Sequence, residues 1–295
     1  MNLQIEWSAL RTDDPELLPE GALYALRTVQ EAGWRLYSDS PELSARQNKL
    51  LINEGIELNT PGTEETVTLI RREIKLQLLH NGSLEAEADT WPDLCRKILF
   101  PERRAQIHRK TGETDIVLSL NLDGTGNSSI ATGLRFFDHM LDQIARHGLI
   151  DLELSCKGDL DVDEHHTIED CGIALGQAIR KAISENKAGI QRYGFVLPMD
   201  EAQATVAIDL SDRPHLRWEV DLKREYVGDF PTEMLKHFFY TVAMNAGATL
   251  YVKADGENEH HITEAVFKGF AKALRFSVSR NERIRGILPT TKGLI

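Results

Sequence analysis

The sequence contains Asp-Glu-His-His-Thr-Ile-Glu-Asp at residues 163–170 and a second copy of the same pattern, Asn-Glu-His-His-Ile-Thr-Glu-Ala, at residues 258–265. Both segments contain His-His-x-x-Glu. Each leads into apolar residues with helical period, namely Ile168, Cys171, Leu175 and Ile179 after the first and Val266, Phe270, Ala273 and Leu274 after the second. The sequence therefore predicts that each segment forms the first turn of a helix, and that the fold contains this helix twice.

The spacing places a carboxylate beside two imidazoles. Residues three and four positions apart lie on one face of a helix, so Glu169 lies next to both His165 and His166. Adjacent histidines diverge by about 100°, which favours one metal ion per histidine over a single ion held by both. The same reasoning applies to the second copy, which consists of His260, His261 and Glu264.

These side chains indicate a metal site. Imidazole with carboxylate suits a borderline divalent ion such as manganese, iron or zinc, and the lack of a nearby cysteine disfavours a thiolate-rich structural zinc site. A single His-His pair at a polar helix start is usually not a metal site. Two copies with identical internal spacing reverse that expectation.

One further histidine precedes each pair at a similar distance. His139 lies 26 residues before His165, and His237 lies 23 residues before His260. We therefore expect His139 and His237 to be equivalent third ligands, which leaves positions on each ion for water or substrate. The spacing is compatible with ligands from one half, from both halves or from two subunits. The pattern is neither H-E-x-x-H nor H-x-x-E-H, so a peptidase is disfavoured.

The composition is that of a globular protein with room for two domains: 295 residues, 41% apolar and 27% charged. A net charge of −12 disfavours nucleic acid as a partner but allows an anionic substrate held by a few local cations. The sequence shows neither a secretory signal pattern nor an apolar run of about 18 residues, so we expect a cytoplasmic protein without a membrane partner. Three scattered cysteines are expected to be small buried apolar residues: Cys95, Cys156 and Cys171.

Residues 1–100 indicate a small α/β domain with no catalytic constellation. The expected elements are strands at 3–10 and 34–37 and helices at 19–33, 40–53, 64–79 and 91–101. His80-Asn81-Gly82 is expected to end the helix at 64–79.

Residues 103–295 form the second predicted domain, and it contains an internal repeat. Each half is predicted as ββαβα. In the first half, the expected strands are 116–122, 128–132 and 151–156, and the expected helices are 136–147 and 164–184. In the second half, the expected strands are 203–209, 215–222 and 249–254, and the expected helices are 231–245 and the segment from the second His-His pair to 279. Residues 128–132 are expected to form a hairpin with 116–122. The predicted fold class is therefore α+β, with a tandem ββαβα repeat behind a small α/β domain.

Three basic residues in loop-like contexts near Gly or Pro are candidates for binding an anion: Arg192, Arg213 and Lys292. Thr290, Thr291 and backbone N–H groups would assist them. A single arginine in a loop is more often a solvated surface charge, so the sequence alone supports each of them weakly. Glu113 opens a strand and is a candidate general acid or base, although taken alone it is typical of an exposed edge residue.

Six segments, in order, resemble imidazoleglycerol-phosphate dehydratase: Phe-Phe-Asp-His-Met-Leu-Asp-Gln-Ile-Ala-Arg-His-Gly (136–148), Asp-Glu-His-His-Thr-Ile-Glu-Asp (163–170), Gly-Phe-Val-Leu-Pro-Met-Asp-Glu (194–201), Arg-Pro-His-Leu (213–216), His-His-Ile-Thr-Glu-Ala-Val-Phe-Lys (260–268) and Pro-Thr-Thr-Lys-Gly (289–293). The resemblance covers the chain from about residue 103 to its end. It implies a ribosomal-protein-S5-domain-2-like fold with two four-stranded sheets. It also implies a hydro-lyase of L-histidine biosynthesis that converts imidazole glycerol phosphate to imidazole acetol phosphate. Members of this family use two Mn2+ per active site and form a homo-oligomer, a hollow 24-mer with active sites between subunits.

The resemblance also assigns roles to residues of this sequence. The metal ligands would be His139, His165, His166, Glu169, His237, His260, His261 and Glu264. The substrate-binding residues would be Glu113, His139, His147, His165, Glu169, Arg192, Arg213, His261, Thr290, Thr291 and Lys292. The catalytic residues would be Glu113, His165, Glu169, His261 and Glu264. Departures from the family pattern are small, namely Asp212 for Gly, Thr290 for Ser and Glu164 for Asp, and none removes a ligand.

The implied chemistry explains the need for metal ions. If the ions hold the substrate's imidazole as imidazolate, ring electrons can expel hydroxide and give a diazafulvene-like intermediate. A base then removes the C–H proton, and the resulting enol tautomerises to the ketone. Glu113 would protonate the leaving hydroxyl, while the identity of the base stays open.

Some family members carry an N-terminal histidinol-phosphate phosphatase of the haloacid-dehalogenase type, which residues 20–57 weakly resemble. That enzyme needs Asp-x-Asp after its first strand, whereas this chain has Gln-Ile-Glu-Trp-Ser-Ala-Leu at residues 4–10. We therefore expect a degenerate domain without phosphatase activity. The alternatives are a bifunctional dehydratase and histidinol-phosphatase, a dinuclear metal hydrolase, and a non-enzymatic metal-storage shell.

Overall fold

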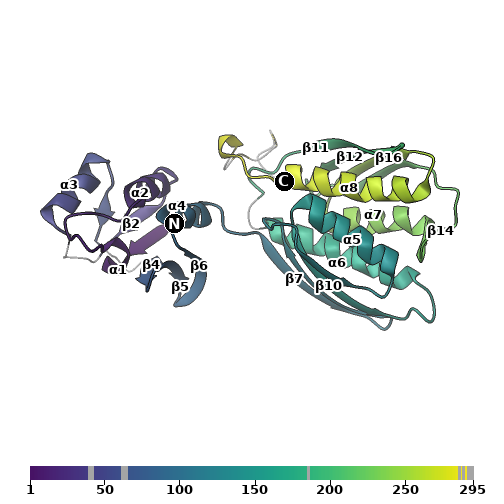
Figure 1. The fold of residues 1–295 in the computed structure, drawn as a ribbon, viewed down its shortest axis with the longest axis horizontal. Helices are drawn as coiled ribbons and strands as arrows, with labels where there is room; N and C mark the ends of the chain where they lie inside the picture. The colour runs from purple at the N-terminus through teal and green to yellow at the C-terminus, as the bar shows by residue number, and fades with distance from the viewer. Residues whose placement is uncertain (39–42, 61–65, 185–186, 285–286, 288–289, 291–295) are drawn as a thin grey trace. The chain divides into compact units, whose positions relative to one another are not determined.

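The computed structural model describes residues 1–38, 43–60, 66–184, 187–284, 287 and 290. Its internal contacts divide the chain into two units, Met1–Pro101 and Glu102–Ile295, which are treated separately below (Figure 1). Among the helices in these ranges, none has the length and apolar character needed to cross a membrane.

The N-terminal unit is built on one six-stranded sheet of order β3-β2-β1-β4-β5-β6. Its strands are β1 (Asn2–Ile5), β2 (Arg35–Tyr37), β3 (Leu58–Asn59), β4 (Val67–Arg72), β5 (Lys75–His80) and β6 (Ser83–Ala88), and its helices are α1 (Trp7–Leu10), α2 (Ala22–Glu31), α3 (Ala45–Asn53) and α4 (Trp91–Leu99). β1 to β4 run parallel, and β4 to β6 form an antiparallel meander. Its core includes Leu3, Leu26 and Leu69.

Three predictions for this unit are wrong. Residues 67–80, most of which were expected in a helix at 64–79, instead form the β4–β5 hairpin, because the alternation of buried Leu76 and Leu78 has the period of a strand. Residues 64 and 65 of the expected helix lie outside the described residues. Asn81 and Gly82, expected as a helix stop, have φ of 50° and 79° and form the two-residue turn between β5 and β6. The strand expected at 3–10 ends at Ile5, since the next residues form α1.

In the first half of the C-terminal unit, the elements are β7 (Arg104–Lys110), β8 (Thr114–Asn121), β9 (Ser128–Ala131), α5 (Arg135–Gly148), β10 (Asp151–Gly158) and α6 (His165–Ser184). The sheet order is β7-β8-β10-β9. β9 pairs in parallel with β10, so the predicted hairpin between β8 and β9 is wrong. The reason is Asp151, whose carboxylate accepts hydrogen bonds from the backbone N–H groups of Thr125, Gly126 and Asn127 and holds this loop beside β10.

The second half repeats this order with β11 (Tyr193–Met199), β12 (Ala202–Asp209), β13 (His215–Val220), α7 (Glu233–Ala246), β16 (Thr249–Asp255) and α8 (Glu259–Ser277). Its sheet order, β11-β12-β16-β13, matches that of the first half. A small hairpin, β14 (Tyr226–Val227) with β15 (Phe230–Pro231), precedes α7, and a short 3-10 turn, η1 (Glu282–Ile284), follows α8. The two four-stranded sheets are those expected, but β7 and β11 were not predicted, so each half is βββαβα.

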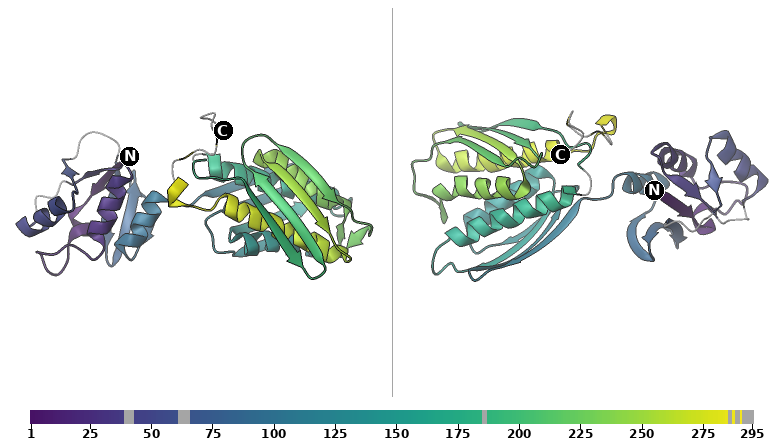
Figure 2. Two further views of the ribbon diagram at one scale, coloured as in Figure 1. Left: turned by 90° about the horizontal axis from the view of Figure 1, so that it is seen from above. Right: turned by 180° about the vertical axis from the view of Figure 1, so that it is seen from behind.

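The helices of this unit lie between its two sheets (Figures 1 and 2). α6 covers β7 and β8, α8 covers β11 and β12, and across the middle α6 packs on α7 and α5 packs on α8. The core between these layers is rich in aromatic side chains, including Phe137, Phe238, Phe239, Phe267 and Phe270. Because each helix pair joins one half to the other, side chains from both halves meet along the pair.

Two glycines allow a very close approach of α6 and α7. A Cβ atom on Gly172 would lie 2.2 Å from the hydroxyl oxygen of Thr241. A Cβ atom on Gly176 would lie 2.7 Å from the carbonyl oxygen of Val242 and 3.0 Å from the nitrogen of Ala246. Backbone atoms cannot turn aside as side chains do, so glycine at 176 sets the separation of the two helices.

We expect Gly176→Ala to lower the free energy of unfolding of the C-terminal unit by about 1–3 kcal/mol, because the added methyl group forces α6 away from α7. Urea denaturation would measure the change. Gly112→Ala is the matched control, since a Cβ atom there meets nothing within 4 Å. Equal stabilities of the two variants would contradict the packing argument.

Candidate functional site

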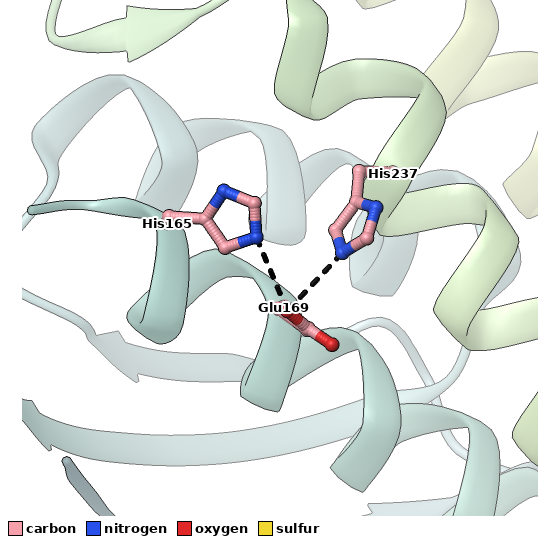
Figure 3. A group of neighbouring side chains, drawn as sticks. All are labelled: His165, Glu169 and His237. Atoms are coloured by element: carbon pink, nitrogen blue, oxygen red, sulfur yellow. Dashed lines mark ion pairs between the residues drawn. The ribbon is translucent and has the colours of Figure 1, made fainter.

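A first cluster of side chains that could hold a metal ion joins the two halves of the repeat. His165 and Glu169 lie one turn apart on α6, and His237 lies on α7. Oε2 of Glu169 is 3.2 Å from Nε2 of His165 and 3.2 Å from Nε2 of His237. The two imidazole centroids are 4.9 Å apart, and both rings are directed at the carboxylate (Figure 3).

The donor set of this cluster fits a divalent ion. Nε2 of His237 is buried and makes no hydrogen bond to any residue that the structure describes. The carboxylate of Glu169 lies within ion-pair distance of that nitrogen, but it approaches from a direction that does not suit a hydrogen bond. Three potential ligand atoms within 4.8 Å of one another, two from imidazoles and one from a carboxylate, are what a borderline divalent ion prefers.

A second cluster repeats the arrangement with the halves exchanged. His260 and Glu264 lie on α8, and His139 comes from α5. Oε2 of Glu264 is 3.3 Å from Nε2 of His260, and Oε1 is 3.9 Å from Nε2 of His139. Nζ of Lys268 lies 2.8 Å from the same Oε1. Burial acts to raise the pKa of Glu264, but the hydrogen bond and charge of Lys268 outweigh it and hold that pKa below its usual value.

Each glutamate is therefore shared between a histidine of its own helix and a histidine of the other half. The sequence left open whether the ligands come from one half, both halves or two subunits. Within one chain, the structure brings together one ligand helix from each half at both clusters. The third histidines, His139 and His237, occupy equivalent places, on α5 and α7.

The other half of the repeat also holds α5 in place. The backbone N–H groups of Arg135 and Phe136 donate to the carboxylate of Asp229, at 2.7 and 2.9 Å. A negative charge at a helix N-terminus is favourable, so Asp229 caps α5 from the loop between β14 and β15. The ring of Phe136 packs edge-on against His260 at 5.2 Å. These contacts fix His139, one turn further along α5, relative to α8.

The second histidine of each pair is directed away from its cluster. Nδ1 of His166 lies 3.0 Å from Asp159, and its Nε2 lies 3.6 Å from Glu113. The hydrogen bond with Asp159, together with the negative charge of Glu113, raises the pKa of His166. The structure thus places Glu113 beside His166 and not beside either cluster.

His261 has an equivalent environment. Its Nδ1 lies 2.8 Å from Oε2 of Glu201, and its Nε2 lies 3.5 Å from Asp200. The hydrogen bond with Glu201 raises the pKa of His261 and lowers that of Glu201 to about 2. Each cluster is therefore flanked by an imidazole that carboxylates keep oriented.

Three of these carboxylates had no predicted role: Asp159, Asp200 and Glu201. A signal for the last two exists in the repeat. Glu113 lies in the turn between β7 and β8, and Asp200 and Glu201 form the equivalent turn between β11 and β12. Comparing the halves strand by strand would have paired these turns, but β7 and β11 were missing from the prediction.

The two arginines expected to bind an anion lie together at the other end of the second sheet. Nε of Arg192 is 2.8 Å from Oδ2 of Asp209, and Nη2 of Arg213 is 3.4 Å from the same oxygen. Arg192 and Asp209 line an open surface pocket of about 260 Å³, together with Tyr193, Thr249 and Tyr251. Both guanidinium groups are largely exposed and available to a ligand.

The C-terminal segment approaches these arginines. The backbone N–H of Gly189 donates to the carbonyl oxygen of Ile287 at 2.9 Å, beside the loop that leads into Arg192. Thr290 follows Ile287 by three residues, whereas Thr291 and Lys292 lie outside the described residues. The shared contact of Arg192 and Arg213 with Asp209 is thus compatible with one anion site.

A long strand separates this anion site from the histidines. β11 begins next to Arg192 and ends at the turn of Asp200 and Glu201 that contacts His261. At about 3.3 Å per residue, such a strand spans about 20 Å. One small substrate therefore cannot contact Arg192 and His261 of the same chain.

His147 extends the α5 face that carries His139. Nε2 of His147 is 3.2 Å from Oε1 of Gln143, and Nε2 of Gln143 is 3.5 Å from Nδ1 of His139. Burial lowers the pKa of His147, and the positive charge of Lys268 lowers it further. The neutral imidazole is therefore favoured beside the second cluster.

Asp212 explains one departure from the family pattern. Its φ of 55° lies in the left-handed region, where glycine is normally favoured. Here the carboxylate accepts a hydrogen bond from Lys187 and forms an ion pair with Arg180 at 3.1 Å. These interactions offset the backbone strain and hold the loop that carries Arg213.

Known proteins similar to this chain are named either imidazoleglycerol-phosphate dehydratase or histidine biosynthesis bifunctional protein. The family model for imidazoleglycerol-phosphate dehydratase matches residues 132–274. The imidazoleglycerol-phosphate dehydratase of Acetivibrio thermocellus is 53% identical over 196 residues, which covers 66% of this chain and 100% of that protein. The histidine biosynthesis bifunctional protein HisB of Spirosoma linguale is 51% identical over 205 residues, or 70% of this chain. The chain spans only about half of that bifunctional relative, 53% of its length.

Solved structures give the same result. The imidazoleglycerol-phosphate dehydratase of Staphylococcus aureus has a TM-score of 0.55 and 34% identity, covering 60% of this chain and 99% of that one. The enzyme of the same name from Pyrococcus furiosus, solved with (S)-C348, has a TM-score of 0.55 and 34% identity and covers 64% of this chain and 100% of that one. Their fold therefore corresponds to the C-terminal unit.

The contact between His261 and Glu201 predicts a measurable pH dependence in the metal-free protein. A raised histidine pKa stabilises the fold below the ordinary value of about 6.5, and this contribution is lost as pH rises through the raised pKa. The lowered pKa of Glu201 stabilises the fold above 4.5, and that contribution is lost as pH falls through about 2. Hydrogen exchange at histidine Cε1, followed by mass spectrometry, should give His261 a pKa above the ordinary value of about 6.5. In the Glu201→Gln variant, the pKa of His261 should return towards that ordinary value. The pKa of His166 is the internal control, and an unchanged His261 would contradict the assignment.

Proposed function

The chain belongs to the imidazoleglycerol-phosphate dehydratase family, and from this premise we propose that it removes water from imidazole glycerol phosphate to give imidazole acetol phosphate in L-histidine biosynthesis. The observation that carries the proposal is the pair of His-Glu-His clusters assembled across the two halves. Duplicated imidazole and carboxylate ligands suit a reaction in which a neutral heterocycle must be bound and polarised on two sides.

Two divalent ions, which we take to be manganese, would occupy the clusters. His165, Glu169 and His237 would hold one ion, and His139, His260 and Glu264 the other. When bound, the ions would act as Lewis acids that stabilise negative charge on the substrate's imidazole, which would favour loss of the neighbouring hydroxyl group. His166 and His261, which contact Glu113 and Asp200 and not the glutamates of the clusters, would complete ligand sets on neighbouring chains.

Glu113 is the proposed acid of the reaction. Its side chain is half-exposed and lies 3.6 Å from Nε2 of His166, so it can reach a leaving hydroxyl while staying close to a bound imidazole. Arg192, Arg213 and Thr290, with Thr291 and Lys292 from the same segment, would bind the phosphate. The base that removes the C–H proton is not assigned.

The separation of these groups supports a homo-oligomer. Because β11 places Arg192 about 20 Å from His261, phosphate and imidazole of one substrate must be bound by different chains. We propose that the active sites lie between subunits of a 24-subunit assembly in the cytoplasm. Neither nucleic acid nor a membrane is a proposed partner, in keeping with the net charge of −12.

Two other functions use the same clusters but differ in product. A dinuclear metal hydrolase would release phosphate or another hydrolysis product from its substrate. A storage shell would bind metal without converting any imidazole compound. The dehydratase instead forms a ketone from imidazole glycerol phosphate without releasing phosphate.

We expect the metal-stripped protein to regain dehydration of imidazole glycerol phosphate when manganese is added back. His165→Ala should lower kcat/KM at least about 100-fold, since it removes a proposed ligand of the first ion. His108→Ala is the matched control, because His108 is an exposed histidine on β7 that pairs with Asp115 on β8. Ketone formation measured by absorbance, with phosphate release measured in parallel, gives the product. Phosphate release, or full activity of His165→Ala, would refute the proposal.

The N-terminal unit is proposed to lack the phosphatase activity of bifunctional relatives. Its parallel strands have the order β3-β2-β1-β4, which makes the carboxyl ends of β1 and β4 the usual place for a ligand. Glu6, Trp7 and Ser8 follow β1 there, and Ser8 accepts a hydrogen bond from the backbone of Arg71. No aspartate stands in this segment to form a phosphorylated intermediate.

We therefore expect no hydrolysis of histidinol phosphate by the purified chain with Mg2+ present. Phosphate release would be compared with that of a variant truncated before Glu102, which removes the N-terminal unit. Equal background rates are expected. Hydrolysis that depends on the N-terminal unit would show that another residue replaces the missing aspartate.

A further inference from the structure

We propose that the two clusters are inequivalent metal sites, in which His165, Glu169 and His237 bind a divalent ion tightly while Lys268 makes the cluster of His139, His260 and Glu264 the weaker site. This inference rests on the proposed function, because it requires that both clusters bind ions. It adds an order of occupation and names the residue that sets it.

The first observation is the convergence of the ligands. In the first cluster, both imidazoles lie 3.2 Å from the same oxygen, Oε2 of Glu169. In the second cluster, the imidazoles lie next to different oxygens of Glu264, at 3.3 and 3.9 Å. A site whose ligand atoms already converge needs less rearrangement to surround an ion, so it binds that ion more tightly.

Helix packing explains this difference. Gly172 and Gly176 let α6 approach α7 so closely that a Cβ atom at either position would collide with α7. This close approach brings His237 next to Glu169. Between α5 and α8, the corresponding contact is looser. A Cβ atom on Gly148 would lie 3.6 Å from the carbonyl oxygen of Ala271, an ordinary contact.

The second observation is the ammonium group of Lys268. It lies 2.8 Å from Oε1 of Glu264, the oxygen that faces His139, and 3.5 Å from the sulfur of Met199. The side chains of Lys268 and Glu264 are only 18% and 9% exposed, so water screens their charges weakly. A divalent ion approaching Oε1 must therefore displace or repel a buried positive charge.

No described residue supplies such a counter-ion to the first cluster. Within the part of the chain that the structure describes, the ion-pair partners of Glu169 are the imidazoles of His165 and His237 alone. Glu169 is also 34% exposed, so water can solvate its charge before an ion binds. The side chain of Glu264 is only 9% exposed and would be costly to leave unpaired, which explains why a lysine accompanies it.

Titration of the metal-free, full-length protein with Mn2+ tests the inference. The electron paramagnetic resonance signal of free aqueous Mn2+ gives the bound fraction at each step. We expect two classes of Mn2+ site, each binding one ion per chain, whose Kd values differ at least about tenfold. Lys268→Met should lower the Kd of the weak site about tenfold or more and leave the Kd of the tight site unchanged. His237→Ala should abolish the tight class, which identifies it.

Lys272→Met is the matched control, because it removes the same charge one turn further along α8 and should leave both classes unchanged. Lys268→Gln provides a second neutral variant that keeps a hydrogen-bond donor for Glu264 if the methionine variant is unstable. A single class of two equal ions in the wild type, or a weak class indifferent to both substitutions at 268, would overturn the inference while leaving the proposed function intact. A wild-type protein that binds no manganese would overturn the metal-dependent function itself.

Discussion

The C-terminal unit depends on one constraint, which is that each ligand glutamate must meet a histidine from the opposite half. Glu169 reaches His237 and Glu264 faces His139 only because the helices of the two halves pack against each other between the sheets. Neither half by itself contains a complete cluster. The interface that buries the aromatic core is therefore also the one that assembles the candidate site, so folding of the repeat and formation of the site are one event.

The sequence predicted much of this site because helical spacing is local information. The i and i+4 relation of His165 to Glu169, and the divergence of His166, follow from helix geometry alone. The spacing of His139 also indicated its place as a third histidine. Spacing could not predict that His237 lies beside Glu169, because the contact of α6 with α7 depends on packing across Gly176.

The failures have physical causes of the same kind. β9 was assigned to the wrong neighbour because the three backbone hydrogen bonds to Asp151 lie in the loop and leave no periodic pattern. The β4–β5 hairpin was taken for a helix because charged residues obscured the alternation of Leu76 and Leu78. The carboxylates of the β11–β12 turn were missed because β11 itself was missed. For β9, a tertiary contact and not local propensity decided the structure.

Duplication gives both halves one backbone plan, yet it leaves their electrostatics free to diverge. The two clusters occupy equivalent turns of α6 and α8, but one glutamate is solvated and the other is buried with Lys268. A buried carboxylate requires a counter-charge whenever no ion is present, whereas a solvated one does not. Symmetric folding therefore does not require symmetric binding. A single charged residue outside the shared His-His-x-x-Glu pattern, Lys268, is enough to give the two glutamates different electrostatic surroundings.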